Sequence, residues 1–339
     1  MFRRKLSIVF CIMLCFSIIS FGLILAFGRK PADVSKKEVV VVASIYPVYL
    51  ITKNLCDGVD GVQVVNLTEN LTGCAHDYQL TTKDMLMLET ADILVVNGGE
   101  MELFITGAAE KLTDIAIVDS SKGISFLSGN AHTHNEEMAI PEETSKINNS
   151  ADETEQMQQS DKITKDHSSI NGHIWLDMVR YEKQIATIAE ALEKIDIIHA
   201  DQYSKNAERY IAEVKTIRES YEKKLSELRG LEVVLFHDAF YYLCDTYGIE
   251  VLHGVDLDAE SALSAGELAE LADEVRFHNV QYFFAEEATG NTAVQLAKET
   301  GSNVIFLDPI TSGPDKLDAY LTAMRQNLDM LLTYCKMEK

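Results

Sequence analysis

Basic residues are scarce in this chain, and so are cysteine, proline and tryptophan. Its 339 residues include 30 Lys and Arg against 53 Asp and Glu, for a formal net charge of −23. A surface this negative repels nucleic acid, so we expect no nucleic-acid partner; the charge is compatible with cation binding or simply with solubility. The 47% hydrophobic content is ample for two cores and indicates a globular protein.

The few cysteines argue against a metal site rich in thiolate ligands. Outside the N-terminal apolar segment they are Cys56, Cys74, Cys244 and Cys335, which have no zinc-finger spacing. One disulfide is permitted outside the cell, but its pairing cannot be deduced. The chain also lacks a His-Glu-x-x-His helix and a nucleophile elbow, which argues against a zinc hydrolase.

The N-terminus contains one long apolar run, residues 6–28, after the basic residues 3–5. This layout is typical of an export signal or a signal anchor, and its length also suffices to span a bilayer. Cys11 and Cys15 follow bulky residues, where lipoprotein processing normally needs a small one. We therefore expect residues 1–30 to be a signal or membrane anchor, with the remainder extracytoplasmic and tethered to the outer face of the cell membrane, or periplasmic if the signal is cleaved.

Apolar runs alternate with helical patterns in two separate parts of the chain. The first part has expected strands at 39–45, 62–67, 93–97 and 115–118, with helices at 47–56, 81–90 and 101–112. The second has expected strands at 231–236, 249–252, 280–285 and 304–307, with helices at 239–247, 264–277, 292–300 and 316–335. This alternation predicts an α/β fold of two lobes, each with a mainly parallel sheet flanked by helices.

A long helix is expected between the two parts. From about residue 200 to 228 the apolar residues recur every three or four positions. Roughly 28 residues at about 1.5 Å rise make a rod of about 42 Å, which favours a rigid linker between lobes. We therefore expect an N-terminal lobe at 38–200, an interdomain linker helix at 201–229 and a C-terminal lobe at 230–339.

Residues 129–170 break the pattern of the N-terminal lobe. The tract is acidic, contains His132, His134 and His167, and lacks the apolar content needed to fold alone. We interpret it as a disordered insertion. Its histidines could capture zinc weakly and pass it on, or the tract could be an ordinary solvated linker, and the sequence does not decide between these readings.

Four polar residues fall where a ligand is expected. His237 and Asp308 directly follow strands of the second lobe, where ligands bind in parallel sheets. His76 lies in an expected loop of the first lobe, and His173 closely follows the insertion, two residues before the only tryptophan. A His3Asp set suits tetrahedral zinc with bonds of about 2.0–2.2 Å. A single such histidine is more often structural; the shared position of all four favours a metal site in the interlobe cleft.

The sequence leaves several choices of ligand and of orienting residue at this site. A water could replace Asp308 as the fourth ligand. Cys74 could enter as a thiolate, although a small buried side chain or half of a disulfide is the more common role. Glu286 and Glu287 end a strand and could orient a histidine, or could be ordinary surface charge.

From about residue 39 to the C-terminus, the chain resembles the zinc and manganese solute-binding proteins of bacterial ABC transporters. The motifs that carry the resemblance are His76 with Tyr78 and Asp84, the segment 91–98, the segment His173-Ile174-Trp175-Leu176-Asp177, the segment 237–242 and Asp308 before Pro309. An acidic, histidine-bearing loop before the second motif is the arrangement of the zinc-specific branch. The chain departs from the family at Ala75, Gly172 and Met178, where proline is customary.

The resemblance implies an extracytoplasmic protein that binds Zn²⁺ and delivers it to an ABC-transporter permease in the bacterial membrane, without enzymatic activity. Manganese-binding members tend to have a carboxylate where this chain has His237, and imidazole suits zinc better. We therefore expect zinc as the transported ligand and a monomer as the working form. A manganese-binding homologue, a zinc-dependent hydrolase, and an adhesin or metal sensor on the same fold are the alternatives.

Overall fold

The structure is a computed structural model, and it describes residues 38–69, 71, 73, 75, 78–109, 112, 115–128, 170–255, 263–287 and 290–335. The chain divides into two compact units, Met1–Val39 and Val40–Lys339, and the second contains almost all of the described residues. No helix in these described ranges is long and apolar enough to cross a membrane. The apolar run at 6–28 lies outside them, so its role stays a prediction.

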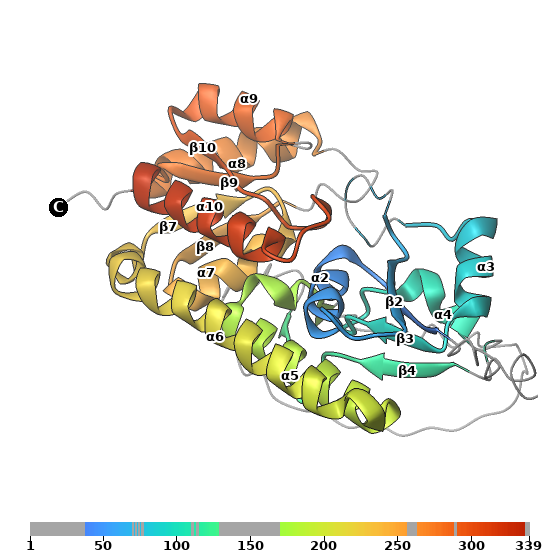
Figure 1. The fold of residues 1–339 in the computed structure, drawn as a ribbon. Helices are drawn as coiled ribbons and strands as arrows, with labels where there is room; N and C mark the ends of the chain where they lie inside the picture. The colour runs from blue at the N-terminus through green and yellow to red at the C-terminus, as the bar shows by residue number, and fades with distance from the viewer. Residues whose placement is uncertain are drawn as a thin grey trace, which may run out of the picture. The chain divides into compact units, whose positions relative to one another are not determined.

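The first sheet lies in the N-terminal part of the chain and has the order β2-β1-β3-β4 (Figure 1). Its strands are β1 (Val39–Ala43), β2 (Val62–Asn66), β3 (Ile93–Val96) and β4 (Ala116–Asp119). β3 is parallel to both β1 and β4, its two neighbours. Runs of β-branched residues such as 39–42 suit a buried strand, and Val42 and Leu94 lie at the centre of the core, fully buried.

Helices α2 (Tyr46–Leu55), α3 (Thr82–Thr90) and α4 (Thr106–Ala109) accompany this sheet. α3 begins with a capping box, in which the hydroxyl of Thr81 accepts from the backbone N–H of Asp84 and the Asp84 carboxylate accepts from that of Thr81. The same carboxylate accepts a hydrogen bond from the Tyr78 hydroxyl at 2.9 Å. The Tyr78 and Asp84 of the first motif therefore fix the start of this helix.

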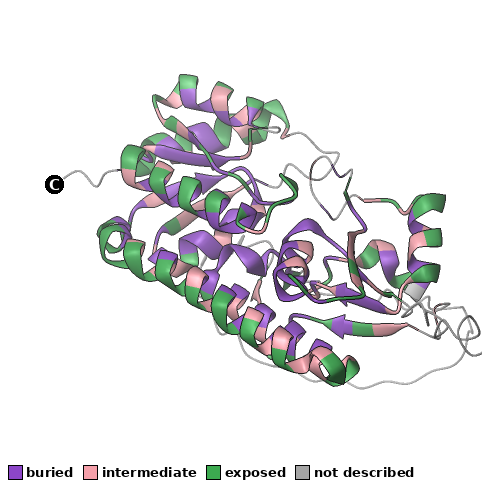
Figure 2. Ribbon diagram, viewed as in Figure 1, coloured by how far each residue is buried: buried purple, intermediate pink, exposed green. Residues whose placement is uncertain are grey.

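The second sheet is parallel throughout, in the order β10-β9-β7-β8. Its strands are β7 (Glu232–Leu235), β8 (Glu250–Gly254), β9 (Tyr282–Ala285) and β10 (Asn303–Phe306), and its helices are α7 (Tyr241–Tyr247), α8 (Ala265–His278), α9 (Asn291–Thr300) and α10 (Ala319–Tyr334). Val234, Phe283 and Val275 share one buried core between strands and helices. The two central strands, β7 and β9, are almost wholly buried, whereas the edge strands β8 and β10 are only partly buried (Figure 2).

Two long helices follow one another in the sequence, after the strands of the first sheet and before those of the second. α5 (Met178–Ile195) and α6 (Ala200–Leu225) lie side by side and are joined by a short 3-10 turn, η4 (Ile197–His199) (Figure 1). The buried positions of α6 follow the period expected from the sequence: Tyr203, Ala207, Tyr210, Val214, Ile217 and Leu225. α6 packs against α2 from the first part and against α10 from the second. The expected fold, two parallel sheets flanked by helices and joined by a long helix, is confirmed.

A pair of very short strands brackets the acidic insertion. β5 (Leu127–Ser128) is antiparallel to β6 (Ile170–Asn171), with Ser128 opposite Ile170. Ile170, which the sequence placed at the end of the insertion, is therefore a strand residue. Residues 129–169, with His132, His134 and His167, lie outside the described part of the chain, and their proposed roles stay predictions.

Candidate metal centre

His237 follows the carboxyl end of β7, as the strand pattern predicted. Phe236 separates it from the strand, and His237 is the N-cap of the 3-10 turn η6 (Asp238–Phe240). The backbone N–H of Ala239 donates to His237 Nδ1 at 3.0 Å. Only 2% of the residue is exposed, so the imidazole faces the protein interior. The end of a parallel strand thus presents a buried nitrogen donor at the edge where ligands bind.

His173 is fully buried and precedes another 3-10 turn, η3 (Ile174–Leu176). Its backbone N–H donates to Asn171 Oδ1 at 3.0 Å, and its Nδ1 lies 3.1 Å from the same oxygen. A carboxamide oxygen can only accept, so Nδ1 carries a proton, and in the neutral imidazole the lone pair is then on Nε2. Asp177, the last residue of the motif, accepts from the backbone N–H groups of Val179 and Arg180 and caps α5.

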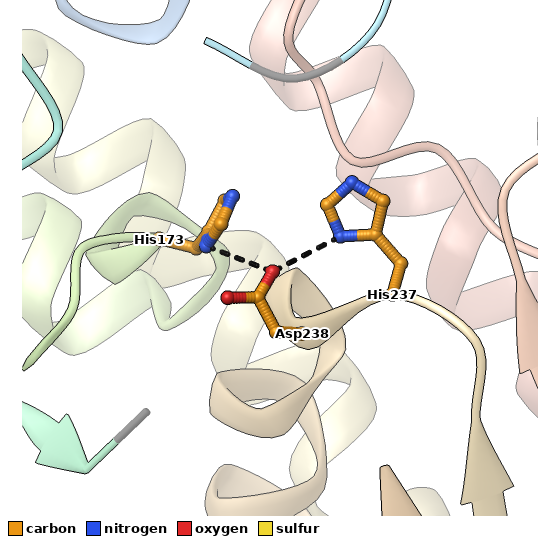
Figure 3. Close-up of side chains that lie close together, drawn as sticks. All are labelled: His173, His237 and Asp238. Atoms are coloured by element: carbon orange, nitrogen blue, oxygen red, sulfur yellow. Dashed lines mark ion pairs between the residues drawn. The ribbon is translucent and has the colours of Figure 1, made fainter. Parts of the chain in front are cut away.

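The two imidazoles lie next to each other. Their ring centroids are 5.4 Å apart at an interplanar angle of 80°. Asp238 Oδ1 lies 3.4 Å from His173 Nδ1 and 3.4 Å from His237 Nδ1 (Figure 3). Among the described residues, this trio is the one group of three possible metal ligands whose donor atoms lie within 4.8 Å of one another.

Asp238 and Asn171 are site residues that the sequence reasoning missed. Asp238 directly follows His237 in the third motif, and Asn171 lies two residues before His173; these positions were the only available signal. The Asn171 side-chain N–H donates to the carbonyl oxygen of Asp238 at 2.9 Å. The Asn171 side chain therefore links the segment of His173 to the backbone that follows His237.

Glu286 approaches the second ring nitrogen of His237, Nε2, whereas Asp238 approaches Nδ1. It follows β9 directly, and its carboxylate is 3.6 Å from His237 Nε2 with 15% of the side chain exposed. Glu287 is exposed. Of the two glutamates considered from the sequence, Glu286 is therefore the one that contacts a histidine of the site.

Asp308 follows β10 and lines a hollow together with Glu286 and Glu287. Its backbone is held by Asn327, whose side chain accepts from Asp308 N–H at 2.8 Å and donates to Asp308 O at 2.7 Å. Solvent reaches the residue, yet protein atoms surround the carboxylate, and the loss of hydration raises its pKa although Ile310 N–H donates to it. Asp308 is not part of the group formed by the two histidines and Asp238.

His76 and Cys74 lie outside the described residues, so the structure does not test either as a ligand. The neighbouring Ala75 is described and buried. The structure thus brings together two of the four expected ligands, His173 and His237, and places a third, Asp308, in the hollow that Glu286 also lines.

The segment around His173 contacts both parts of the fold. Asn97, just after β3, donates to the carbonyl oxygen of Gly172 at 2.9 Å. From the other part, the Tyr242 hydroxyl donates to Asn171 O at 2.6 Å and the Tyr320 hydroxyl to Trp175 O at 2.8 Å. The sequence places this segment in the N-terminal lobe, and its side-chain and backbone groups also hydrogen-bond to the C-terminal part of the chain.

Two of the departures from the customary prolines have a structural account. A Cβ added at Gly172 would lie 2.7 Å from the backbone oxygen of Gly99, so the close approach of two backbones leaves no room for a side chain. Met178 is the first residue of α5, where proline is favoured because the N–H has no partner within the helix. Methionine is compatible with this position.

The chain belongs to the ZnuA family, described as zinc-uptake complex component A, periplasmic, which matches residues 41–334. The resemblance seen in the sequence motifs is thereby confirmed.

Relatives and a solved structure agree with this assignment. The chain is 27% identical over 339 residues to the high-affinity zinc uptake system protein ZnuA of Bacillus subtilis, covering 97% of each chain. It is 28% identical over 329 residues to the zinc-binding protein AdcA of Streptococcus pyogenes serotype M3, covering 94% of this chain but only 60% of AdcA. The Zn(II)-bound ZnuA-like domain of Streptococcus pneumoniae AdcA has the same fold, with a TM-score of 0.66 at 23% identity, covering 87% of this chain and 98% of that chain.

Proposed function

We propose that this chain is an extracytoplasmic zinc-binding protein that captures Zn²⁺ and delivers it to an ABC-transporter permease. The observation that carries the proposal is the pair of buried imidazoles of His173 and His237, whose ring centroids are 5.4 Å apart. Two such donors, brought together from segments distant in sequence, are suited to a transition-metal ion. Membership of the zinc-uptake family supports the transport role.

We propose His76 and Asp308 as the remaining ligands. In the sequence His76 lies two residues before Tyr78, and the Tyr78–Asp84 hydrogen bond fixes the chain at Tyr78. Asp308 lines the same hollow as Glu286, whose carboxylate is 3.6 Å from His237 Nε2. The Nε2 atoms of both described histidines lie on the side of the rings away from Asp238 in Figure 3, and we assign zinc to that side.

Zinc is favoured over manganese because the proposed donors are mainly imidazole nitrogens. Manganese prefers sets rich in carboxylate and carbonyl oxygen, whereas imidazole suits zinc. The relatives, a zinc-binding protein (AdcA) and a high-affinity zinc uptake system protein (ZnuA), support the same choice.

Binding and delivery are favoured over hydrolysis. A catalytic zinc keeps an open position for water beside a general base, whereas a binding site closes around the ion with protein ligands. His173 is fully buried and His237 is 2% exposed, which suits retention of an ion more than turnover of a substrate. We therefore propose that the chain is not an enzyme.

Competition against a chelator of known affinity tests the metal and its ligands. We expect the full chain to bind Zn²⁺ more tightly than Mn²⁺, and His173→Ala and His237→Ala each to lower zinc affinity by at least about 100-fold, since each removes a direct ligand. His278→Ala is the matched control, because this histidine is on α8 with 36% of its side chain exposed and an ion-pair distance of 3.6 Å to Glu232. Tighter binding of Mn²⁺, or unchanged affinity in both site variants, would contradict the proposal.

Growth of a deletion strain tests delivery. We expect the strain to grow poorly in zinc-depleted medium and to recover with added zinc or with the wild-type gene, but not with the His237→Ala gene. An unchanged growth rate after deletion in a strain with no second zinc importer would argue against a role in uptake.

A further inference from the structure

We propose that Asp238 is a positioning residue that holds both imidazoles of the zinc site in the orientation that binds the ion. This inference rests on the proposed function. A single carboxylate oxygen, Asp238 Oδ1, lies 3.4 Å from Nδ1 of His173 and 3.4 Å from Nδ1 of His237. In Figure 3 the carboxylate lies between the Nδ1 atoms, and both Nε2 atoms are on the far side of the rings. Asp238 therefore contacts both proposed ligands at Nδ1, the ring nitrogen that does not bind zinc in this assignment.

His173 is held in the metal-binding tautomer by two acceptors. Its Nδ1 faces Asn171 Oδ1 at 3.1 Å as well as Asp238 Oδ1, and neither oxygen has a proton to donate when Asp238 is ionised. The orientation of the Asn171 amide is fixed because its oxygen accepts from His173 N–H and its nitrogen donates to Asp238 O. The proton of His173 is thus on Nδ1, and the Nε2 lone pair is available to zinc.

The zinc-binding tautomer of His237 depends on Asp238 more strongly than that of His173 does. In this structure its Nδ1 accepts from Ala239 N–H at 3.0 Å, and its Nε2 faces the Glu286 carboxylate at 3.6 Å. For Nε2 to bind zinc as a neutral imidazole, the ring proton must be on Nδ1. The hydrogen bond from Ala239 N–H is lost in that tautomer, because two donors would face each other, and Asp238 Oδ1, 3.4 Å away, accepts the Nδ1 proton instead. Asp238 therefore supplies the acceptor that the zinc-binding tautomer of His237 requires.

Direct ligation by Asp238 is the competing arrangement. It would place zinc on the Nδ1 side of both rings, because that is the side on which the carboxylate lies. His173 Nδ1 already donates to Asn171, so its lone pair is not available there. This contact favours the positioning role.

Zinc competition on the full chain and its variants is the first measurement. Groups that orient metal ligands typically contribute about 10–100-fold to metal affinity. We expect a loss in this range for Asp238→Ala and a smaller loss for Asp238→Asn, which keeps an acceptor oxygen without the charge. Asp273→Asn is the control for removal of one negative charge, because this carboxylate on α8 is 83% exposed, and it should leave affinity unchanged. Circular dichroism of each variant checks that it is folded.

Nitrogen NMR of the histidine rings in the zinc-loaded, ¹⁵N-histidine-labelled protein is the second measurement. We expect zinc on Nε2 and a slowly exchanging Nδ1–H for both His173 and His237. In Asp238→Ala the Nδ1–H of His237 should exchange much faster, while that of His173 stays protected by Asn171. A role in folding alone would not produce this asymmetry.

These measurements distinguish a positioning role for Asp238 from direct ligation and from no role. Zinc on Nδ1 of the wild-type rings would overturn the inference in favour of direct ligation, and so would loss of an oxygen ligand in the zinc X-ray absorption spectrum of Asp238→Ala. Wild-type affinity in both Asp238 variants would overturn any role for this residue. If the wild-type chain itself fails to bind zinc, the proposed function fails first, before the variants are compared.

Discussion

The indole N–H of Trp175 donates to the carbonyl oxygen of Pro309 at 2.8 Å. Trp175 lies two residues after His173, and Pro309 is the residue that follows Asp308. The bond therefore ties the segment of one proposed ligand to the segment of another. Both partners are buried, so the bond is shielded from competition by water.

Loss of this bond should be measurable as loss of stability. Trp175→Phe leaves the Pro309 oxygen buried without its donor, and we expect the free energy of unfolding to fall by about 1–3 kcal/mol, with a further loss from the cavity left by the smaller ring. Urea unfolding followed by circular dichroism measures it. Tyr320→Phe is the comparison, because it removes the hydroxyl that donates to Trp175 O but keeps the ring stacked on Tyr181 at 3.6 Å. A loss below about 0.5 kcal/mol in Trp175→Phe would show that the bond contributes little.

Gly172→Ala should perturb the site that it adjoins. The added Cβ would lie 2.7 Å from Gly99 O, so one backbone must move, and overpacking of this kind typically costs about 1–3 kcal/mol. We expect lower stability together with weaker zinc binding, because the movement is transmitted to His173. Gly107→Ala in α4 is the control, since nothing lies within 4 Å of its Cβ position. Equal behaviour of the two variants in urea unfolding and zinc competition would contradict this account.

Glu102 should make stability depend on pH. Its carboxylate accepts from the Ser44 hydroxyl and from the N–H groups of Asn97 and Gly98, but burial outweighs these donors and raises its pKa from 4.5 to about 7. The folded chain therefore holds this proton more tightly than the unfolded chain. The associated stability is present below pH 4.5 and is lost as pH rises through about 7, a change of up to about 3 kcal/mol.

Comparison of the unfolding free energies of a Glu102 variant and the wild type isolates the contribution of this carboxylate to the pH dependence. We expect Glu102→Gln to lower stability overall, because an amide cannot accept all of these hydrogen bonds, but to flatten the change in unfolding free energy between pH 5 and 8 relative to wild type. Glu100→Gln, at an exposed neighbour, should keep the wild-type slope. A wild-type slope in Glu102→Gln would mean that another group titrates.

The insertion should be removable without loss of the zinc site. Ser128 and Ile170 face each other in the β5–β6 pair, so replacement of residues 129–169 by Asn-Gly would close an antiparallel hairpin. We expect the affinity of the main site to stay within about threefold, a change of less than about 0.7 kcal/mol. Calorimetry would show whether the wild type binds additional zinc weakly. A His132→Ser, His134→Ser and His167→Ser triple variant separates the histidines from the length of the tract, and abolished binding in the deletion would make the tract part of the site.

Much of the architecture could be predicted because it depends on local patterns. The period of α6 in the sequence matches its buried face, and His237 and Asp308 follow strands as expected. The role of Asp238 could not be predicted, because it depends on how two imidazole rings turn toward one carboxylate. The attachment of the His173 segment to Tyr242 and Tyr320 was also missed, since hydrogen bonds over 71 and 145 positions leave no periodic signal. His76 stays a prediction.

Trp175 is the only tryptophan of the chain, it is fully buried, and its ring centroid lies 5.1 Å from that of His173. The protein thus contains a single indole, beside the proposed ion site, whose fluorescence can be excited selectively over that of the tyrosines. Its emission should respond to zinc at His173 without any label, and it comes from one position only. Stopped-flow fluorescence could therefore follow the arrival and release of the ion in real time, in the unmodified chain.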